Sequence, residues 1–234
     1  LDLITFETTW FSVSAIWVYN AYYDETYDRF VLCGYNTVSS YLAIIGGNLD
    51  NDIASYSSIV GDSVFKDVTW IDETHFVAVG YGSKSNSNYV AFIQSFLFID
   101  DNLVSTNYKL FESNETSSTI NLFSNVYYEN GCIGVIGTTS GIVETKDDSF
   151  LGNIFGISDQ EFFVCGTVSV FSTSLQFISG HKYFSMQSGY GKQSQFSNSL
   201  SLGNGTYICV GVSNYKSGDE LTSGYIQYGV ELFK

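Results

Sequence analysis

The sequence contains no proline among its 234 residues and has a single arginine, Arg29. Only 14% of the residues are charged, whereas about a quarter is usual for soluble domains. Ser, Thr, Asn and Tyr must therefore cover much of the surface. No apolar run approaches the roughly 18 residues that a membrane-spanning helix needs, so we predict no transmembrane segment.

Positive charge is also scarce, since 9 Lys and Arg face 24 Asp and Glu and give a net charge of −15. Nucleic-acid backbones and anionic membranes are bound through Lys and Arg, so the sequence argues against both as partners. An acidic surface instead suits cations, cationic partners or simple solubility. The two histidines, His75 and His181, do not form a metal-spaced pair.

What the sequence does contain is a recurring apolar run that ends in glycine. It occurs five times, as FVLCG ending at Gly34, FVAVG at Gly80, IGVIG at Gly137, FFVCG at Gly166 and YICVG at Gly211. The copy from Ser63 to Tyr81 aligns with Ser149 to Thr167 without a gap. A unit of this size cannot bury its apolar face alone, so the copies are expected to pack on one another.

Turn residues precede each of the aligned apolar runs. They are Asp72–Thr74, Asn130–Gly131, Ser158–Gln160 and Asn204–Gly205. Asn-Gly between two β-type runs is typical of a tight hairpin, because both residues tolerate positive φ. Each unit is therefore predicted to begin as a β-hairpin, and its nearly uniform apolar second strand suits a strand covered on both faces.

Further strand-like segments follow the glycine, and the 18 Tyr and 19 Phe also favour β-structure. Four antiparallel strands in a unit of about 40 to 50 residues are typical of a β-propeller blade. We predict an all-β single domain over residues 1–234, a five-bladed β-propeller whose third blade is truncated by the short interval between Gly137 and Gly166. Residues Leu3–Thr9 are expected to close the ring by pairing in the last blade.

The cysteines are predicted to form no disulfide. Cys33 and Cys165 hold equivalent places in their units, and equivalent positions around a ring point the same way, which is poor geometry for a disulfide. Two sequons, at Asn114 and Asn204, lie in polar or turn segments and make glycosylation possible.

Two acidic turns offer oxygen ligands of the kind that calcium uses. Their carboxylates belong to Asp50, Asp52, Asp100 and Asp101. The turns lack the regular ligand spacing of a helix-loop-helix calcium site, and hairpin turns recruit Asp and Asn for backbone reasons. The turn interpretation therefore outweighs the calcium one, and no other cofactor is predicted.

An enzyme is the least favoured hypothesis, because a five-bladed glycosidase needs two carboxylates in one cavity. Asp67, Asn125 and Asn153 occupy matching places, and only one of them is a carboxylate. A recurring Asp or Asn more often makes a structural hydrogen bond, so no catalytic residue is assigned. A carbohydrate-binding ring is a stronger rival, since Trp10, Trp17 and Trp70 could stack on sugars.

With these residues in view, FVAVGYG at Phe76–Gly82 resembles the inner-strand core of small β-propeller repeats, broadly the kelch-type and bacterial surface-propeller repeats. The resemblance implies a propeller over nearly the whole chain. The leading hypothesis is a non-catalytic interaction or structural module of a secreted or cell-surface assembly with a protein partner. A lectin is the alternative, and a glycoside hydrolase-like propeller the third.

Overall fold

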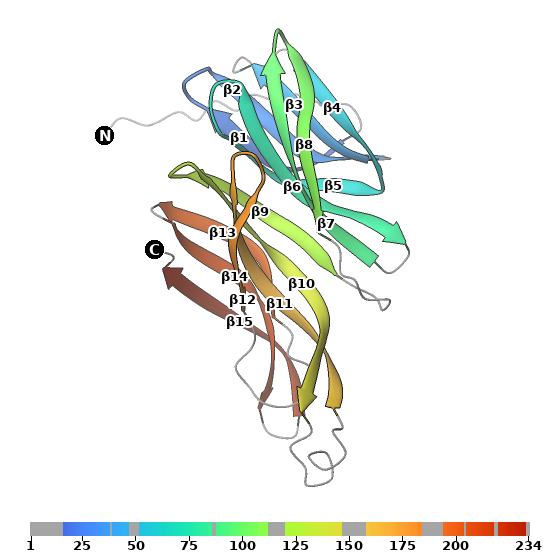
Figure 1. Ribbon diagram of the computed structural model, residues 1–234. Helices are drawn as coiled ribbons and strands as arrows, with labels where there is room; N and C mark the ends of the chain where they lie inside the picture. The colour runs from blue at the N-terminus through green and yellow to red at the C-terminus, as the bar shows by residue number, and fades with distance from the viewer. Residues whose placement is uncertain are drawn as a thin grey trace, which may run out of the picture.

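The chain folds into antiparallel β-sheets (Figure 1). The computed structural model describes residues 16–37, 39–46, 52–85, 88–111, 120–146, 158–183, 194–203, 205–217 and 220–232. Within these ranges there is no helix, which confirms the all-β prediction. No helix in the described part of the chain has the length and apolar character needed to cross a bilayer.

The described strands form four sheets, each built from strands consecutive in sequence. The first sheet contains β1 (Ile16–Asp24), β2 (Arg29–Asn36), β3 (Ser39–Gly46) and β4 (Asp52–Gly61). The second contains β5 (Ser63–Trp70), β6 (His75–Ser85), β7 (Asn88–Ile99) and β8 (Asn102–Phe111). The third contains β9 (Asn121–Glu129), β10 (Cys132–Lys146), β11 (Ser158–Ser172) and β12 (Phe177–Tyr183). The fourth contains β13 (Ser194–Gly203), β14 (Thr206–Ser217) and β15 (Glu220–Leu232).

The sequence predicts turns between the first two strands of the second, third and fourth sheets. Asn130 and Gly131 have φ values of 52° and 77° between β9 and β10, the geometry that Asn-Gly hairpins require. The predicted turn at Asp72–Thr74 joins β5 to β6. Gly205 has a φ of 73° before β14, and Asn204 lies outside the described residues.

The prediction of a hairpin around Ser158–Gln160 is wrong. These residues lie inside β11, which pairs with β10 from Lys146↔Ser158 to Cys132↔Ser172. The third blade is therefore not truncated, because the apolar run ending at Gly166 supplies its third strand. An interior third strand is covered on both faces, as a second strand is, and so has the same apolar composition.

The division into five units is accordingly not confirmed, since the third and fourth predicted units share one sheet. Among the described residues the fourth sheet has three strands. The predicted closing strand, Leu3–Thr9, lies outside the described residues.

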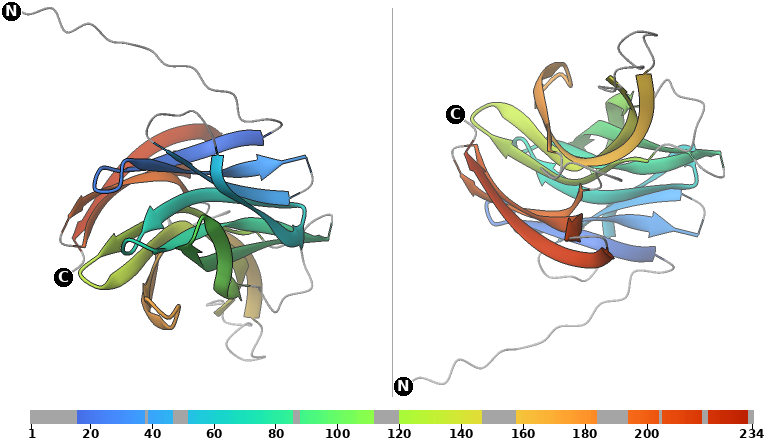
Figure 2. Two further views of the ribbon diagram at one scale, coloured as in Figure 1. Left: turned by 90° about the horizontal axis from the view of Figure 1, so that it is seen from above. Right: turned by 90° about the horizontal axis from the view of Figure 1, so that it is seen from below.

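The sheets pack on one another in chain order, and Figure 2 shows the first three as successive layers from blue to yellow. One cluster joins the first and second sheets and includes Val31, Ile44 and Phe76. A second cluster joins the second and third sheets. A third cluster places Ile136 and Val168 against Tyr207 and Cys209 of the fourth sheet.

The second sheet is apolar on both faces, as its sequence predicts. Phe76 and Ala78 of β6 enter the cluster with the first sheet, whereas Val77 and Val79 enter the cluster with the third. All four side chains are fully buried. Burial of this kind contributes about 25 cal/mol for each Å² of apolar surface removed from water.

Four of the five recurring glycines face a β-bulge in the preceding strand, and the exception is Gly166, which pairs with Thr138 without a register shift. Gly80 pairs with Phe65, and the register then shifts by one residue, at Lys66. A Cβ at Gly80 would collide with the carbonyl oxygen of Val64. Gly34 and Gly137 face equivalent backbone oxygens across their own bulges. The glycine is required because a bulge brings the two backbones too close for a side chain.

We predict that Gly80→Ala lowers the free energy of unfolding by about 3 kcal/mol, because backbone must move to admit the methyl group. Gly131→Ala is the matched control: its site is open, and it should cost about 1 kcal/mol for the positive φ alone. Urea denaturation measures both values. Equal losses in the two variants would contradict the collision argument.

Candidate functional site: an acidic and aromatic pocket between two hairpin turns

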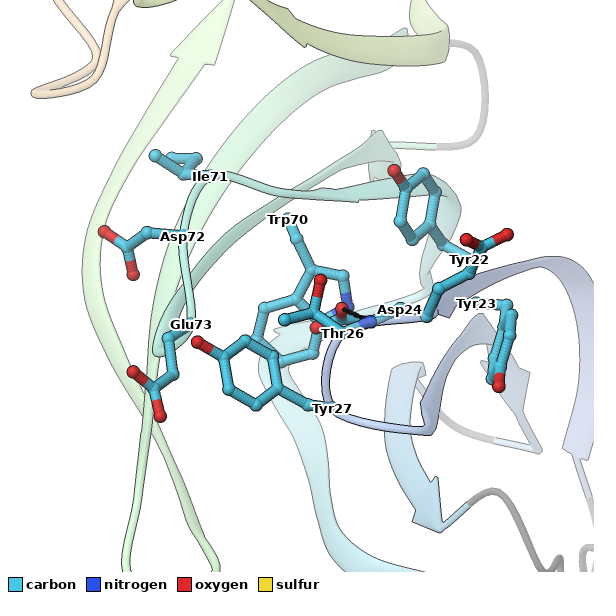
Figure 3. Close-up of a pocket in the computed structure, with 10 residues that line it drawn as sticks. Tyr22, Tyr23, Asp24, Thr26, Tyr27, Trp70, Ile71, Asp72 and Glu73 are labelled. Atoms are coloured by element: carbon cyan, nitrogen blue, oxygen red, sulfur yellow. Dashed lines mark hydrogen bonds between the residues drawn. The ribbon is translucent and has the colours of Figure 1, made fainter.

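A pocket of about 490 Å³ lies between the β1–β2 turn and the β5–β6 turn (Figure 3). The end of β1 and the turn after it contribute the lining residues Tyr22, Tyr23, Asp24, Glu25, Thr26 and Tyr27, and the end of β5 and the turn after it contribute Trp70, Ile71, Asp72 and Glu73. The two turns belong to different sheets, so the packing of the first sheet on the second creates the pocket.

Arg29, the only arginine of the chain, joins the two turns. Its guanidinium donates hydrogen bonds of 3.2 and 3.1 Å to Asp24 Oδ2 from Nε and Nη2. Nη2 also donates to the carbonyl oxygen of Glu73 on the opposite turn. The Arg29 Cζ lies 3.9 Å from the centroid of the Trp70 ring and 4.7 Å from that of Tyr27. Arg29 is thus held by a carboxylate, a carbonyl and two aromatic faces.

The pocket rim is acidic. Four carboxylates, those of Asp24, Glu25, Asp72 and Glu73, line a pocket whose neighbouring cation is Arg29. The carboxylate of Asp72 accepts hydrogen bonds from the backbone of Thr74 and His75 at 2.9 and 2.8 Å. Burial alone would raise the pKa of Asp72, but these bonds and the contact with His75 outweigh it and lower that pKa.

Three tyrosines complete the rim and remain accessible. The side chains of Tyr22, Tyr23 and Tyr27 are 44%, 44% and 43% exposed. The hydroxyl of Tyr23 donates a 2.8 Å hydrogen bond to Asp28 Oδ1, and this bond raises its pKa. Partial burial, together with Glu73, raises the pKa of Tyr27. Both rings therefore stay neutral at pH 7, and their faces remain electron-rich.

A larger exposed surface continues from the pocket along β1. Trp17, Val18 and Tyr19 are 58%, 47% and 47% exposed. The first strands β5 and β9 have no exposed residue, whereas the first strand β13 is also exposed, with Leu200 and Leu202 at 59% and 55%. We call the exposed side chains of Trp17, Val18, Tyr19, Tyr22 and Tyr23 the β1 surface. Because neighbouring side chains of a strand alternate between its two faces, the β1 surface comprises both exposed faces of this strand.

A chain of Asp and Asn side chains links the first strands of the four sheets. Asn20 Nδ2 donates to Asp67 Oδ1 at 2.6 Å, and Asn125 Nδ2 donates to Asp67 Oδ2 at 3.5 Å. Asn125 Nδ2 also lies 3.1 Å from Asn198 Oδ1, which accepts from it. Each of the four residues sits beside the bulge of its strand. We call these four side chains the Asx chain.

Asp67 is the centre of the Asx chain. Its oxygens also accept hydrogen bonds of 2.8 Å from the backbone N–H groups of Val68 and Val126. Asp67 is 5% exposed, and burial raises its pKa to about 6 even though all four donors favour the carboxylate. A carboxylate enclosed in this way is occupied by structural hydrogen bonds.

Two of the tryptophans proposed for sugar stacking can be placed. Trp70 lines the pocket but is 8% exposed, with one face against Arg29. Trp17 lies on the β1 surface and stacks with Tyr35 at 5.3 Å between ring centroids. The structure does not bring these two together at one site. Trp10 lies outside the described residues.

The acidic turns take the conformation that their turn interpretation predicts. Asp100 and Asp101 have φ values of 50° and 57° between β7 and β8. Asp50 lies outside the described residues, and Asp52 begins β4. Among the described residues, no group of three or more His, Cys, Asp or Glu side chains is placed to hold a metal ion.

The structure describes all four cysteines but not three of the asparagines named above. Asn114, Asn153 and Asn204 lie outside the described residues. The four cysteines are free thiols, and burial strongly raises the pKa of Cys33. Sequence reasoning missed the Arg29 clamp, and the signal that could have found it was a lone arginine beside an acidic hairpin turn.

No protein-family model and no curated protein sequence matches this chain.

Replacing the guanidinium of Arg29 should loosen both turns. We predict that Arg29→Lys lowers the free energy of unfolding by about 1–2 kcal/mol, because an ammonium cannot reproduce the forked hydrogen bonds and the stacking. Arg29→Met should cost about 3 kcal/mol, since Asp24 is then left without its cation. Chemical denaturation of the three proteins gives the order, and a fully stable Arg29→Met variant would contradict the clamp.

Asp67 should make stability depend on pH. Its folded pKa of about 6 exceeds that of an unfolded aspartate, so the folded state binds the proton more tightly. The contribution is complete below about pH 4 and is lost as the pH rises through 6, by roughly 3 kcal/mol at 1.36 kcal/mol per pKa unit. The stability difference between the wild type and Asp67→Asn should fall over this window. A constant difference would contradict the raised pKa.

Proposed function

We propose that the protein is a non-catalytic interaction module of an extracellular or cell-surface assembly, and that the β1 surface binds a protein partner. The observation that carries the proposal is the exposure of this surface. Trp17, Val18 and Tyr19 are about half exposed, at positions where β5 and β9 carry buried or half-buried residues. Clustered exposed aromatic side chains are typical of protein–protein interfaces.

We further propose that the sheets are blades of an irregular β-propeller. Three observations support this arrangement: each sheet is an antiparallel meander, each packs on the next in chain order, and the first strands are joined by the Asx chain. Adjacent first strands with equivalent bulges are what a radial arrangement of blades would produce. A propeller of this kind offers its loops and inner strands to partners.

The geometry favours an interaction module over the two alternatives. The carboxylate that a hydrolase would need, Asp67, is buried and fully engaged by hydrogen-bond donors. The tryptophan best placed in a pocket, Trp70, has one ring face covered by Arg29 and cannot offer it to a sugar. Protein recognition requires only the exposed aromatic patch that is present.

Site-specific photo-crosslinking tests the proposal. With p-benzoylphenylalanine in place of Trp17, we expect a discrete protein adduct when the protein is irradiated in cell-surface or secreted material of its source. The same photoreactive group in place of Tyr108 is the matched control, because this β8 residue is 60% exposed and belongs to another sheet. The adduct should weaken when Tyr19→Ser is added.

Two outcomes would contradict the proposal. One is an identical set of adducts from the two positions, which would indicate contact without specificity. The other is the absence of any protein adduct at Trp17 together with selective retention of a neutral glycan on an array, which would favour the lectin alternative.

A further inference from the structure

We propose that the pocket beside the β1 surface is a site for a basic side chain, the lysine or arginine of a peptide segment in the partner. This inference rests on the proposed function, since it names the chemistry of the partner that the β1 surface binds. Along β1 the contact with the partner is apolar, whereas the turns around the pocket recognise a charge.

Carboxylates make the pocket negatively charged. Asp24 is already neutralised by Arg29, but the carboxylates of Glu25, Asp72 and Glu73 have no arginine or lysine within 4 Å among the described residues. Asp72 interacts with the imidazole of His75. Bringing three carboxylates to one rim is unfavourable without a cation, and the chain as a whole carries a charge of −15. A positively charged ligand would relieve this repulsion.

The tyrosine rings that line the pocket also suit a cation. Tyr22, Tyr23 and Tyr27 all line the pocket and are each more than two-fifths exposed, and the Tyr23 ring turns away from that of Tyr22 onto Phe30 (Figure 3). Cations bind over the faces of aromatic rings at up to about 6 Å from the ring centroid, and aromatic cages are the usual site for ammonium groups. A neutral apolar ligand would gain nothing from the carboxylates, and an anion would be repelled by them.

Two cations of the protein itself lie over aromatic rings of the pocket and of the β1 surface. Arg29 is held by the Trp70 and Tyr27 rings, by Asp24 and by a backbone carbonyl of the second turn. Lys66 likewise lies with Nζ 3.7 Å from the centroid of the Tyr19 ring. Aromatic rings and an acidic neighbour thus hold Arg29, and an aromatic ring lies against Lys66.

A buried hydrogen-bond donor without a partner favours a peptide over a small ion as the ligand. Trp70 Nε1 is buried without a hydrogen-bond partner in the described structure. In Figure 3 it lies on the side of the ring turned toward Asp24 and Thr26. The turn residues that cover it are exposed, so a segment bound between the turns could supply a carbonyl acceptor. The volume of about 490 Å³ admits a long side chain with its flanking peptide groups.

The test measures peptide binding through the indole N–H signal of Trp70 in ¹⁵N-labelled protein, assigned by comparison with Trp70→Phe. The probes are Ac-Gly-Lys-Gly-NH₂, its arginine counterpart and the neutral norleucine counterpart, which has the same backbone and an apolar stem. We expect saturable shifts with the lysine and arginine peptides, at least about fivefold weaker binding of norleucine, and weakening by added salt.

A pair of variants separates the pocket from the general field of the protein. Glu25→Gln combined with Glu73→Gln should weaken the lysine peptide at least about fivefold, because both residues line the pocket. Asp100→Asn combined with Asp101→Asn removes the same charge at another turn and should leave affinity within about twofold, since Asn tolerates the positive φ of both sites. Equal weakening by the two variants, or binding of norleucine as tight as lysine, would overturn the inference.

Failure of the basic-side-chain site and failure of the proposed function give different results. If the adduct at Trp17 forms and survives Glu25→Gln with Glu73→Gln undiminished, the interaction module stands and the basic-side-chain site does not. If the lysine peptide binds as described and no adduct forms at Trp17, the pocket site stands and the β1 surface is not the partner interface. Preference for maltotriose over the lysine peptide would overturn the inference in favour of a sugar site.

Discussion

The arrangement of the sheets depends on the β-bulge in each first strand. A bulge turns an Asp or Asn side chain away from its own sheet and brings the opposite backbone so close that only glycine fits. The freed side chain can then bond to the first strand of the next sheet, as Asn20 does with Asp67. One irregularity in the hydrogen-bond ladder therefore accounts for both the recurring glycine and the contact between consecutive sheets.

The local pattern of the sequence predicted the strands well. Apolar runs such as Phe76–Val79 and turns such as Asn130–Gly131 specify their conformation through nearby residues, and both were correct. The assignment of strands to sheets was less predictable. The run ending at Gly166 has the composition of a second strand but is a third strand, because every interior strand faces two apolar layers. Composition alone could not separate the two positions.

The candidate site was harder to predict for a related reason. Trp70 was singled out as a large aromatic residue, but its partner Arg29 lies more than forty residues away and on another sheet. The structural interpretation of Asp67 and Asn125 came from their matching places in the sequence, and both residues do belong to the Asx chain. Asn20 was missed because it lies 14 residues before Gly34, whereas Asp67 lies 13 before Gly80; Asn198 lies 13 before Gly211 and was overlooked although its place in the sequence matches.

The meander topology also affects how cooperativity is distributed. Each sheet is made from neighbouring strands, and each apolar cluster joins only two consecutive sheets. Stability in such a chain approximates a sum of sheet terms and nearest-neighbour interface terms, as in linear repeat proteins. Among the described residues the second and third sheets each take part in two of these clusters, so local opening of the fourth sheet disrupts one cluster and leaves the bonds of Asp67 to the first and third sheets in place.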